Sequence, residues 1–156
     1  MSQQQQPSKQ VCMMIAGSLM MGVLIFGAVM AAQGKFRNPN PDPVLTGIGV
    51  GAAALMAVLS FVIPPIIVSN AARQMKSGGR QLTEQNYLAL FQTQMIIRFA
   101  MLEGAIFMNL VLDHQFSLPV AAALLVNMIL QFPTPGRIDN WVRNRMELDS
   151  FENPQD

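Results

Sequence analysis

Long runs without charge constrain this chain more than any other feature of its sequence. Residues 11–32 and 44–70 contain no Asp, Glu, Lys or Arg, and residues 116–132 form a third uncharged run. At about 1.5 Å per residue, the two longer runs can cross the roughly 30 Å hydrocarbon core of a bilayer, and the third is near the lower limit. Charged residues make up only 12% of the chain, about half the share found in soluble proteins. Lipid is therefore the expected solvent for most side chains.

We expect an all-α, polytopic membrane protein with four transmembrane helices and a C-terminal amphipathic helix at the membrane surface. The expected spans lie at residues 11–32, 44–70, 91–112 and 116–132, within one membrane domain of residues 11–132. A mobile polar tail of residues 1–10 precedes this domain, and a cytoplasmic tail of residues 133–156 follows it. Pro64 and Pro65 predict a kink in the second span.

The first span has an alternative interpretation. Residues 11–32, preceded by Lys9, could be a cleaved secretory signal. The apolar core of such a signal is usually about 7 to 15 residues long. The run here is longer, which favours a retained transmembrane helix.

The C-terminal tail contains apolar residues at helical spacing. Ile138, Val142 and Met146 recur every four residues, with Trp141 among them. We expect this helix to lie in the membrane interface, anchored by Trp141 together with Arg137 and Arg143. The alternative is a solvated tail in which the tryptophan is incidental.

The distribution of positive charge predicts the orientation. Seven of the ten Lys and Arg residues lie in the N-terminal tail, the second loop and the C-terminal tail, and two lie in the first loop. Cytoplasmic loops carry the excess of Lys and Arg. Both termini and the loop from Arg73 to Arg80 are therefore expected in the cytoplasm, with the protein in a bacterial inner membrane.

The composition argues against several classes of function. Cys12 is the only cysteine and His114 the only histidine, so a Cys/His zinc cluster and an intrachain disulfide are excluded. No hydrolytic triad can be assembled around His114. The net charge is +1, so no basic excess points to nucleic acid. We expect neither enzymatic activity nor a cofactor.

Small residues recur at the start of the second span. Gly47 and Gly51 form a Gly-x-x-x-Gly pair, and Gly49 and Ala53 lie beside it. This spacing lets two helix backbones approach closely. It predicts helix packing within one chain or between chains, and a specialised close-packed ring is the alternative.

Glu103 is the residue that most suggests chemistry. It lies about 19 Å along a helix about 33 Å long, close to the bilayer centre. An ionised carboxylate is costly there, so the side chain should be protonated, paired or in contact with water. If residues 113–115 form a hairpin, Asn127 has a similar depth and is the expected neighbour. A Glu103–Asn127 hydrogen bond would join the third and fourth spans, and the alternative is a proton or sodium site at these residues.

Arg98, Asn109 and Gln131 are further polar residues within the spans, and we interpret them as interhelical contacts. Arg98 and Gln131 have matching depths nearer the cytoplasmic face, where Arg98 could also reach the headgroups. Five residues turn a helix by about 500°, which leaves Arg98 and Glu103 about 140° apart. These two charged side chains therefore need different partners.

Three short motifs in the second and third spans carry a resemblance to a known family. They are Gly47-Ile48-Gly49-Val50-Gly51, Ala72-Arg73-Gln74, and Met95-Ile96-Ile97 ahead of Glu103-Gly104-Ala105-Ile106-Phe107. Over roughly residues 44–112 the chain resembles the proteolipid c subunit of rotary ATP synthases. In that family a mid-membrane carboxylate binds the transported ion and the glycine-rich helix packs the inner ring. The resemblance implies ion binding at Glu103.

We therefore expect a small integral membrane protein that serves as a structural or interaction component of a membrane assembly. Its expected partners are the lipid bilayer and either a second copy of the chain or another membrane protein. The alternative is proteolipid-like handling of protons or sodium through Glu103.

Overall fold

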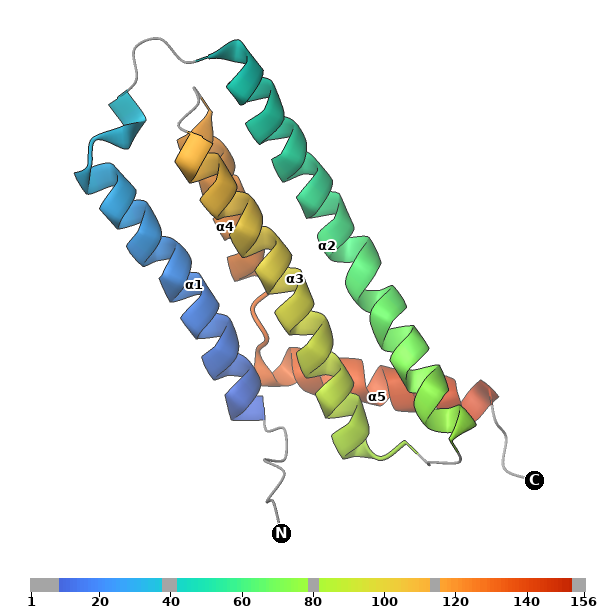
Figure 1. Ribbon diagram of the computed structural model, residues 1–156. Coiled ribbons are helices and arrows are strands. Elements are labelled where there is room, and N and C mark those ends of the chain that lie inside the picture. Colours follow the sequence, from blue (N-terminus) through green and yellow to red (C-terminus); the bar gives the residue numbers. More distant parts are fainter. Residues whose placement is uncertain (1–8, 38–41, 79–81, 113–115, 153–156) are drawn as a thin grey trace.

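The computed structural model describes residues 9–37, 42–78, 82–112 and 116–152, and within them the chain is all-α, as predicted. The elements are α1 (Lys9–Ala32), a short 3-10 helix η1 (Lys35–Arg37), α2 (Pro43–Ser77), α3 (Glu84–Leu112), α4 (Ser117–Leu130) and α5 (Pro135–Glu152) (Figure 1). Residues 1–8 of the expected polar tail and the expected hairpin at residues 113–115 lie outside the described residues.

Three helices are long and apolar enough to cross a membrane, namely α1, α2 and α3. Helix α4 has 14 residues and reaches only about 21 Å, so it is too short to cross by itself. Together α4 and α5 form a pair bent by 67°, which adds a fourth candidate span if the pair is counted as one. Three or four candidate spans agree with the expected integral membrane protein.

Helices α2 and α3 extend beyond their apolar runs. Helix α2 continues to Ser77, and α3 begins at Glu84. Most of residues 71–90, which separate the expected second and third spans, is therefore helical. The start of α2 is capped by Asp42, whose Oδ1 accepts a hydrogen bond from the Val44 N–H at 2.8 Å. Such a cap satisfies a backbone donor that the first helical turn leaves unpaired.

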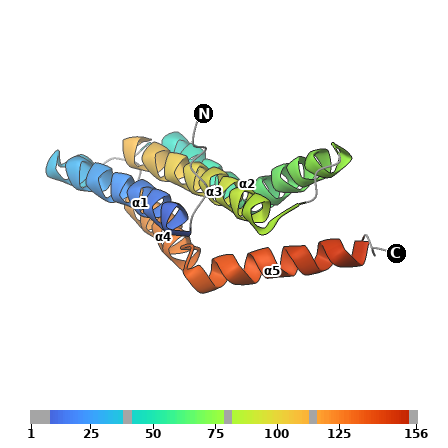
Figure 2. The ribbon, with the colours of Figure 1, turned by 90° about the horizontal axis from the view of Figure 1, so that it is seen from below.

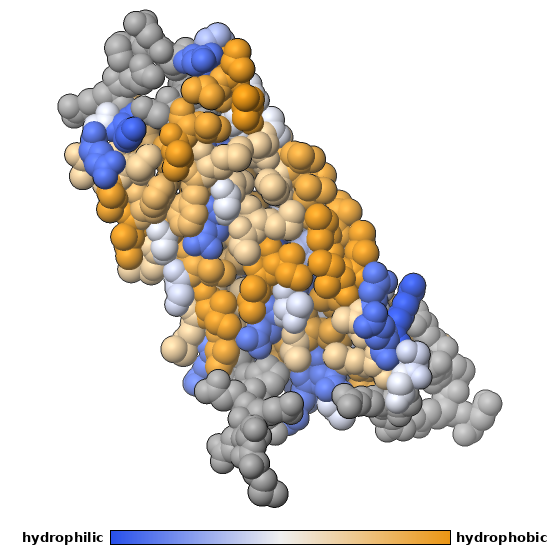
Figure 3. Space-filling view, viewed as in Figure 1, coloured by the Kyte–Doolittle hydropathy of each residue, from blue (hydrophilic) through white to orange (hydrophobic). Residues whose placement is uncertain are grey.

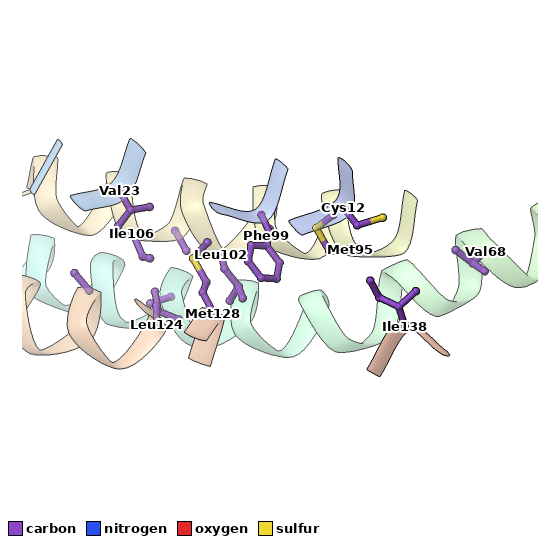
Figure 4. Close-up of a cluster of buried hydrophobic side chains, with 14 of the residues drawn as sticks. Cys12, Val23, Val68, Met95, Phe99, Leu102, Ile106, Leu124, Met128 and Ile138 are labelled. Carbon is purple, nitrogen blue, oxygen red and sulfur yellow. The ribbon is translucent and has the colours of Figure 1, made fainter. Parts of the chain in front are cut away.

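Helix α3 is the centre of the bundle and packs against α1, α2, α4 and α5 (Figures 1 and 2). Of its apolar stretch 39% is buried, against 17% for α1 and for α2. Phe99, Leu102 and Ile106 form a fully buried row on α3, and Met128 of α4 belongs to the same cluster (Figure 4). Every other span is therefore positioned by its contact with α3.

Helix α5 lies across the end of the bundle at which α1 begins (Figures 1 and 2). Its residues Ile138 and Val142 are buried and lie four positions apart, about one turn along the helix. Polar contacts join it to three other helices: Asp139 pairs with Lys9 of α1, and Asp149 contacts both Lys76 of α2 and Tyr87 of α3. The C-terminal helix is thus fastened to the ends of α1, α2 and α3.

The face of the bundle seen in Figure 3 is mainly hydrophobic between its two ends. Large apolar side chains such as Ile25 of α1 and Ile48 and Val58 of α2 are exposed. A continuous apolar surface of this kind is unfavourable in water and suits contact with lipid chains.

Candidate functional site

A proline in α2 creates a polar site inside the bundle. In an α-helix the carbonyl of Ser60 would accept a hydrogen bond from the N–H of residue 64, but Pro64 has no N–H. Both Ser60 and Pro64 are buried on the side of α2 that faces the bundle. Pro64 therefore leaves a backbone acceptor without its helical donor where water is scarce.

Arg98 of α3 satisfies this carbonyl. Its Nε donates to the Ser60 oxygen at 3.0 Å, and its guanidinium carbon lies 5.2 Å from the centre of the Phe61 ring. The carbonyl acceptor and the aromatic face both stabilise the cation in a region of low dielectric constant. Arg98 thus links α3 to α2, a contact that the depth comparison with Gln131 does not reveal.

Glu103 faces α1. A Cβ atom built on Gly22 would lie 3.1 Å from the Glu103 Oε1, so the glycine leaves room for the carboxyl group. The Glu103 side chain is half-buried, and it has no hydrogen-bond or ion-pair partner within residues 9–37, 42–78, 82–112 and 116–152. Arg98 and Glu103 are thus directed to different helices, in agreement with their expected angular separation.

Asn127 and Gln131 bond to each other along α4. The Gln131 Nε2 donates to the Asn127 Oδ1 at 2.7 Å. Asn109 is fully buried and donates to the Ala105 oxygen of its own helix at 2.8 Å. The expected Glu103–Asn127 bond is not among the hydrogen bonds of the described residues, because Glu103 is rotated toward α1.

The small residues of α2 divide between two faces. Gly49 and Ala53 are buried in the bundle. Gly47 and Gly51 are exposed, and a Cβ atom built on either one would meet no atom within 4 Å. The Gly-x-x-x-Gly pair therefore points away from the other helices of the same chain.

A second polar cluster lies at the end of the bundle. The Asp149 carboxylate pairs with the Lys76 Nζ at 2.8 Å and accepts a hydrogen bond from the Tyr87 hydroxyl. Burial by itself raises the pKa of Asp149, but the hydrogen bonds from Lys76 and Tyr87, together with the positive charges of Lys76 and Arg145, outweigh burial, and the pKa falls below its ordinary value. The ionised carboxylate is thus the form that holds α5 against α2 and α3.

The residues expected to anchor α5 have protein contacts as well. Trp141 packs edge-on against Phe91 of α3, with ring centres 5.4 Å apart. Arg137 donates to the Leu130 carbonyl at the end of α4, and Arg143 bonds the Asn140 side chain at 3.1 Å. Trp141 and Arg137 therefore connect α5 to its neighbours in addition to any contact with lipid.

Within the described residues no group of three or more His, Cys, Asp or Glu side chains could hold a metal ion. Comparison with protein-family models, with curated proteins and with solved structures returns no match. The candidate function of the chain is therefore argued from its own residues and contacts.

Proposed function

We propose that this chain is a non-enzymatic integral membrane protein that forms a structural assembly with further copies of itself through α2. In this proposal α1, α2 and α3 are three spans, residues 116–132, which contain α4, form a short fourth span, and α5 lies on the cytoplasmic surface of a bacterial inner membrane. The orientation is supported by Lys9, Arg73, Lys76 and the arginines of α5, which gather at one end of the bundle (Figure 1). Both termini are then cytoplasmic.

One observation carries the proposal of assembly. Gly47 and Gly51 leave open space on the outward side of α2, while Gly49 and Ala53 already serve the packing inside the chain. Two helices that present this spacing can bring their backbones into van der Waals contact, which is a main source of helix association in lipid. Closed homo-oligomers are the commonest soluble assemblies, and a second copy supplies a matching surface without any further partner.

Replacing Gly47 and Gly51 together with isoleucine is expected to reduce the oligomer by about tenfold, the change that roughly 1.4 kcal/mol of lost packing produces. A Cβ atom at either position meets no atom of the same chain within 4 Å, so the monomer should fold normally. The measurement is chemical cross-linking and native mass spectrometry of the purified protein in mild detergent. Gly17→Ile is the matched control, because a Cβ atom at Gly17 of α1 also meets open space. A monomeric wild-type protein would contradict self-assembly. A complex with a different protein that is lost when Gly47 and Gly51 are replaced would also contradict it, and would show that α2 binds that protein.

A second candidate function is proton handling through Glu103. It is supported by the place of the carboxyl group near the middle of the expected third span, and by its half-buried position beside Gly22 without a partner within the described residues. Ionisable side chains inside a membrane usually mark functional sites. The resemblance to proteolipid subunits implies ion binding at the same residue.

Dicyclohexylcarbodiimide is expected to label Glu103 selectively, because the reagent enters lipid and attacks protonated carboxyl groups. Labelling should slow as the pH rises, and mass spectrometry of peptides locates the adduct. Glu103→Gln should abolish it, whereas Glu84→Gln, at the exposed start of α3, should leave it unchanged. Absence of labelling at every pH would remove this candidate and leave the assembly proposal intact.

A further inference from the structure

The short length of α4 leaves a pocket beneath its C-terminal end. Helix α4 stops at Leu130, about 10 Å short of the thickness of the hydrocarbon core, and the chain then bends into α5. The space between α3, the end of α4 and the start of α5 is a partly open pocket of about 240 Å³. Its walls are Phe91, Gln94, Met95, Arg98, Phe99, Gln131, Pro133, Arg137 and Trp141.

Two residues that line this pocket carry side-chain acceptors that lack donors. The side-chain Oε1 atoms of Gln94 and Gln131 are buried and have no partner within the described residues. The orientation of the Gln131 amide is set by its Nε2, which donates to Asn127. A buried acceptor without a partner costs free energy, so an occupant that carries N–H or O–H donors would be favoured.

Two guanidinium groups in the same pocket have donors to spare. Arg98 uses its Nε for the Ser60 carbonyl, and Arg137 uses one Nη for the Leu130 carbonyl. Their other N–H groups have no partner within the described residues. Guanidinium groups bind phosphate oxygens through such N–H groups. The residues that line the pocket therefore combine phosphate-binding donors with hydrogen-bond acceptors that lack a partner.

The location of the pocket indicates where its occupant comes from. Gln94 lies only about 5 Å, and Arg98 about 10 Å, inside the start of the expected third span at residue 91, from where the long Arg98 side chain can reach toward the headgroups. Phe91, Met95 and Trp141 supply apolar walls. Membrane lipids reach this level with their acyl chains in the hydrocarbon, whereas a soluble anion would have to leave water for a mainly apolar wall.

We propose that this pocket binds the headgroup of a phospholipid that combines a phosphate with hydrogen-bond donors, of which phosphatidylethanolamine is the simplest. The phosphate contacts the remaining N–H groups of Arg98 and Arg137, and the ammonium group donates to the amide oxygens of Gln94 and Gln131. A phosphatidylcholine headgroup carries the same phosphate but no N–H, so it would leave both amide oxygens unpaired. This site does not depend on the proposed assembly through α2.

The full-length protein in detergent micelles, given equal amounts of phosphatidylethanolamine and its mono-, di- and trimethylated derivatives with identical acyl chains, tests the proposal. Native mass spectrometry separates the bound lipids by mass. The monomethyl lipid still has two N–H donors for the two amide oxygens and should be retained like phosphatidylethanolamine. Retention is expected to fall for the dimethyl lipid and to reach about one tenth or less for phosphatidylcholine, which has no N–H donor. Equal retention of the four lipids would overturn the proposal.

Variants separate the acceptors from the phosphate contacts. Gln94→Leu combined with Gln131→Leu should bring the ratio of bound phosphatidylethanolamine to phosphatidylcholine close to one. Arg137→Gln should weaken both lipids together and preserve their ratio. The matched controls are Gln92→Leu, two residues from Gln94 and outside the pocket, and Lys35→Gln in η1 at the opposite end of the bundle. A preference that survives loss of both glutamines would overturn the assignment.

A soluble ligand is distinguished by competition. Inorganic phosphate or phosphoethanolamine in large excess should leave the bound lipid in place, because neither has acyl chains to hold it at this depth. Displacement of the lipid by either compound would assign the pocket to a soluble phosphate compound and overturn the lipid proposal. Adduct counts are taken separately for each oligomeric state, so a failure of assembly through α2 is distinguishable from a failure of lipid binding.

Discussion

Arg98→Leu is expected to destabilise the folded chain by about 2 kcal/mol, because the Ser60 carbonyl loses a charged donor and stays unpaired. The same exchange also removes a cation from the membrane, which favours the variant to an extent that depends on depth. A double-mutant cycle with Pro64→Ala separates the two effects, since the cost of the cation is present in both backgrounds.

Pro64→Ala restores a backbone N–H that can pair with the Ser60 carbonyl, so Arg98→Leu should cost at most about half as much in that background. Unfolding in mixed micelles, followed by circular dichroism, provides the four free energies. Pro65→Ala is the matched control, because it restores a donor for the carbonyl of Phe61 and should not rescue Arg98→Leu. An equal cost of Arg98→Leu in all three backgrounds would show that Arg98 does not act through the proline-released carbonyl.

Acidification is expected to release α5 from the bundle. The pKa of Asp149 is lower in the folded protein than its ordinary value of 3.8, so the stabilisation is complete above that value. It is lost as the pH falls from 3.8 through the folded pKa, where the carboxyl group becomes protonated. Loss of the contacts with Lys76 and Tyr87 should cost on the order of 1–2 kcal/mol, since both partners of the ion pair are partly exposed.

Trp141 reports this transition, because it is the only tryptophan and packs against Phe91. Its emission should shift on acidification in the wild-type protein. Asp149→Asn should show a loosened α5 already at neutral pH and no transition in this window. Asp139→Asn, which removes the partner of Lys9 at the other end of α5, should keep the transition. An unchanged pH profile in Asp149→Asn would contradict the assigned role.

The membrane helices could be predicted from the sequence because each depends on its own residues. A helix in lipid satisfies its backbone hydrogen bonds internally, so an uncharged run of sufficient length is an adequate signal whatever packs beside it. Helix ends in water carry no such signal. The uncharged runs therefore do not predict that α2 and α3 continue into residues 71–90, which separate the expected second and third spans. Of the four expected spans, the one that contains α4 has the weakest signal, because its uncharged run is barely long enough to cross the membrane.

The candidate site shows where sequence reasoning stops. Residue counting can match depths, as it did for Glu103 and Asn127, but it cannot set the rotation of one helix about its axis relative to the next. The Ser60 carbonyl did have a sequence signal, since a proline four residues later removes its donor. No signal named Arg98 as the group that would replace that donor.

The sequence by itself determined that this chain is helical, that it belongs in a membrane, and which polar residues are carried into the apolar region, because these properties follow from composition along a single helix. Only the tertiary structure decided which of those residues meet. It placed Arg98 against α2, Glu103 against α1 and Asp149 beneath the bundle, because the way the other four helices pack around α3 is settled by shape and space over the whole molecule.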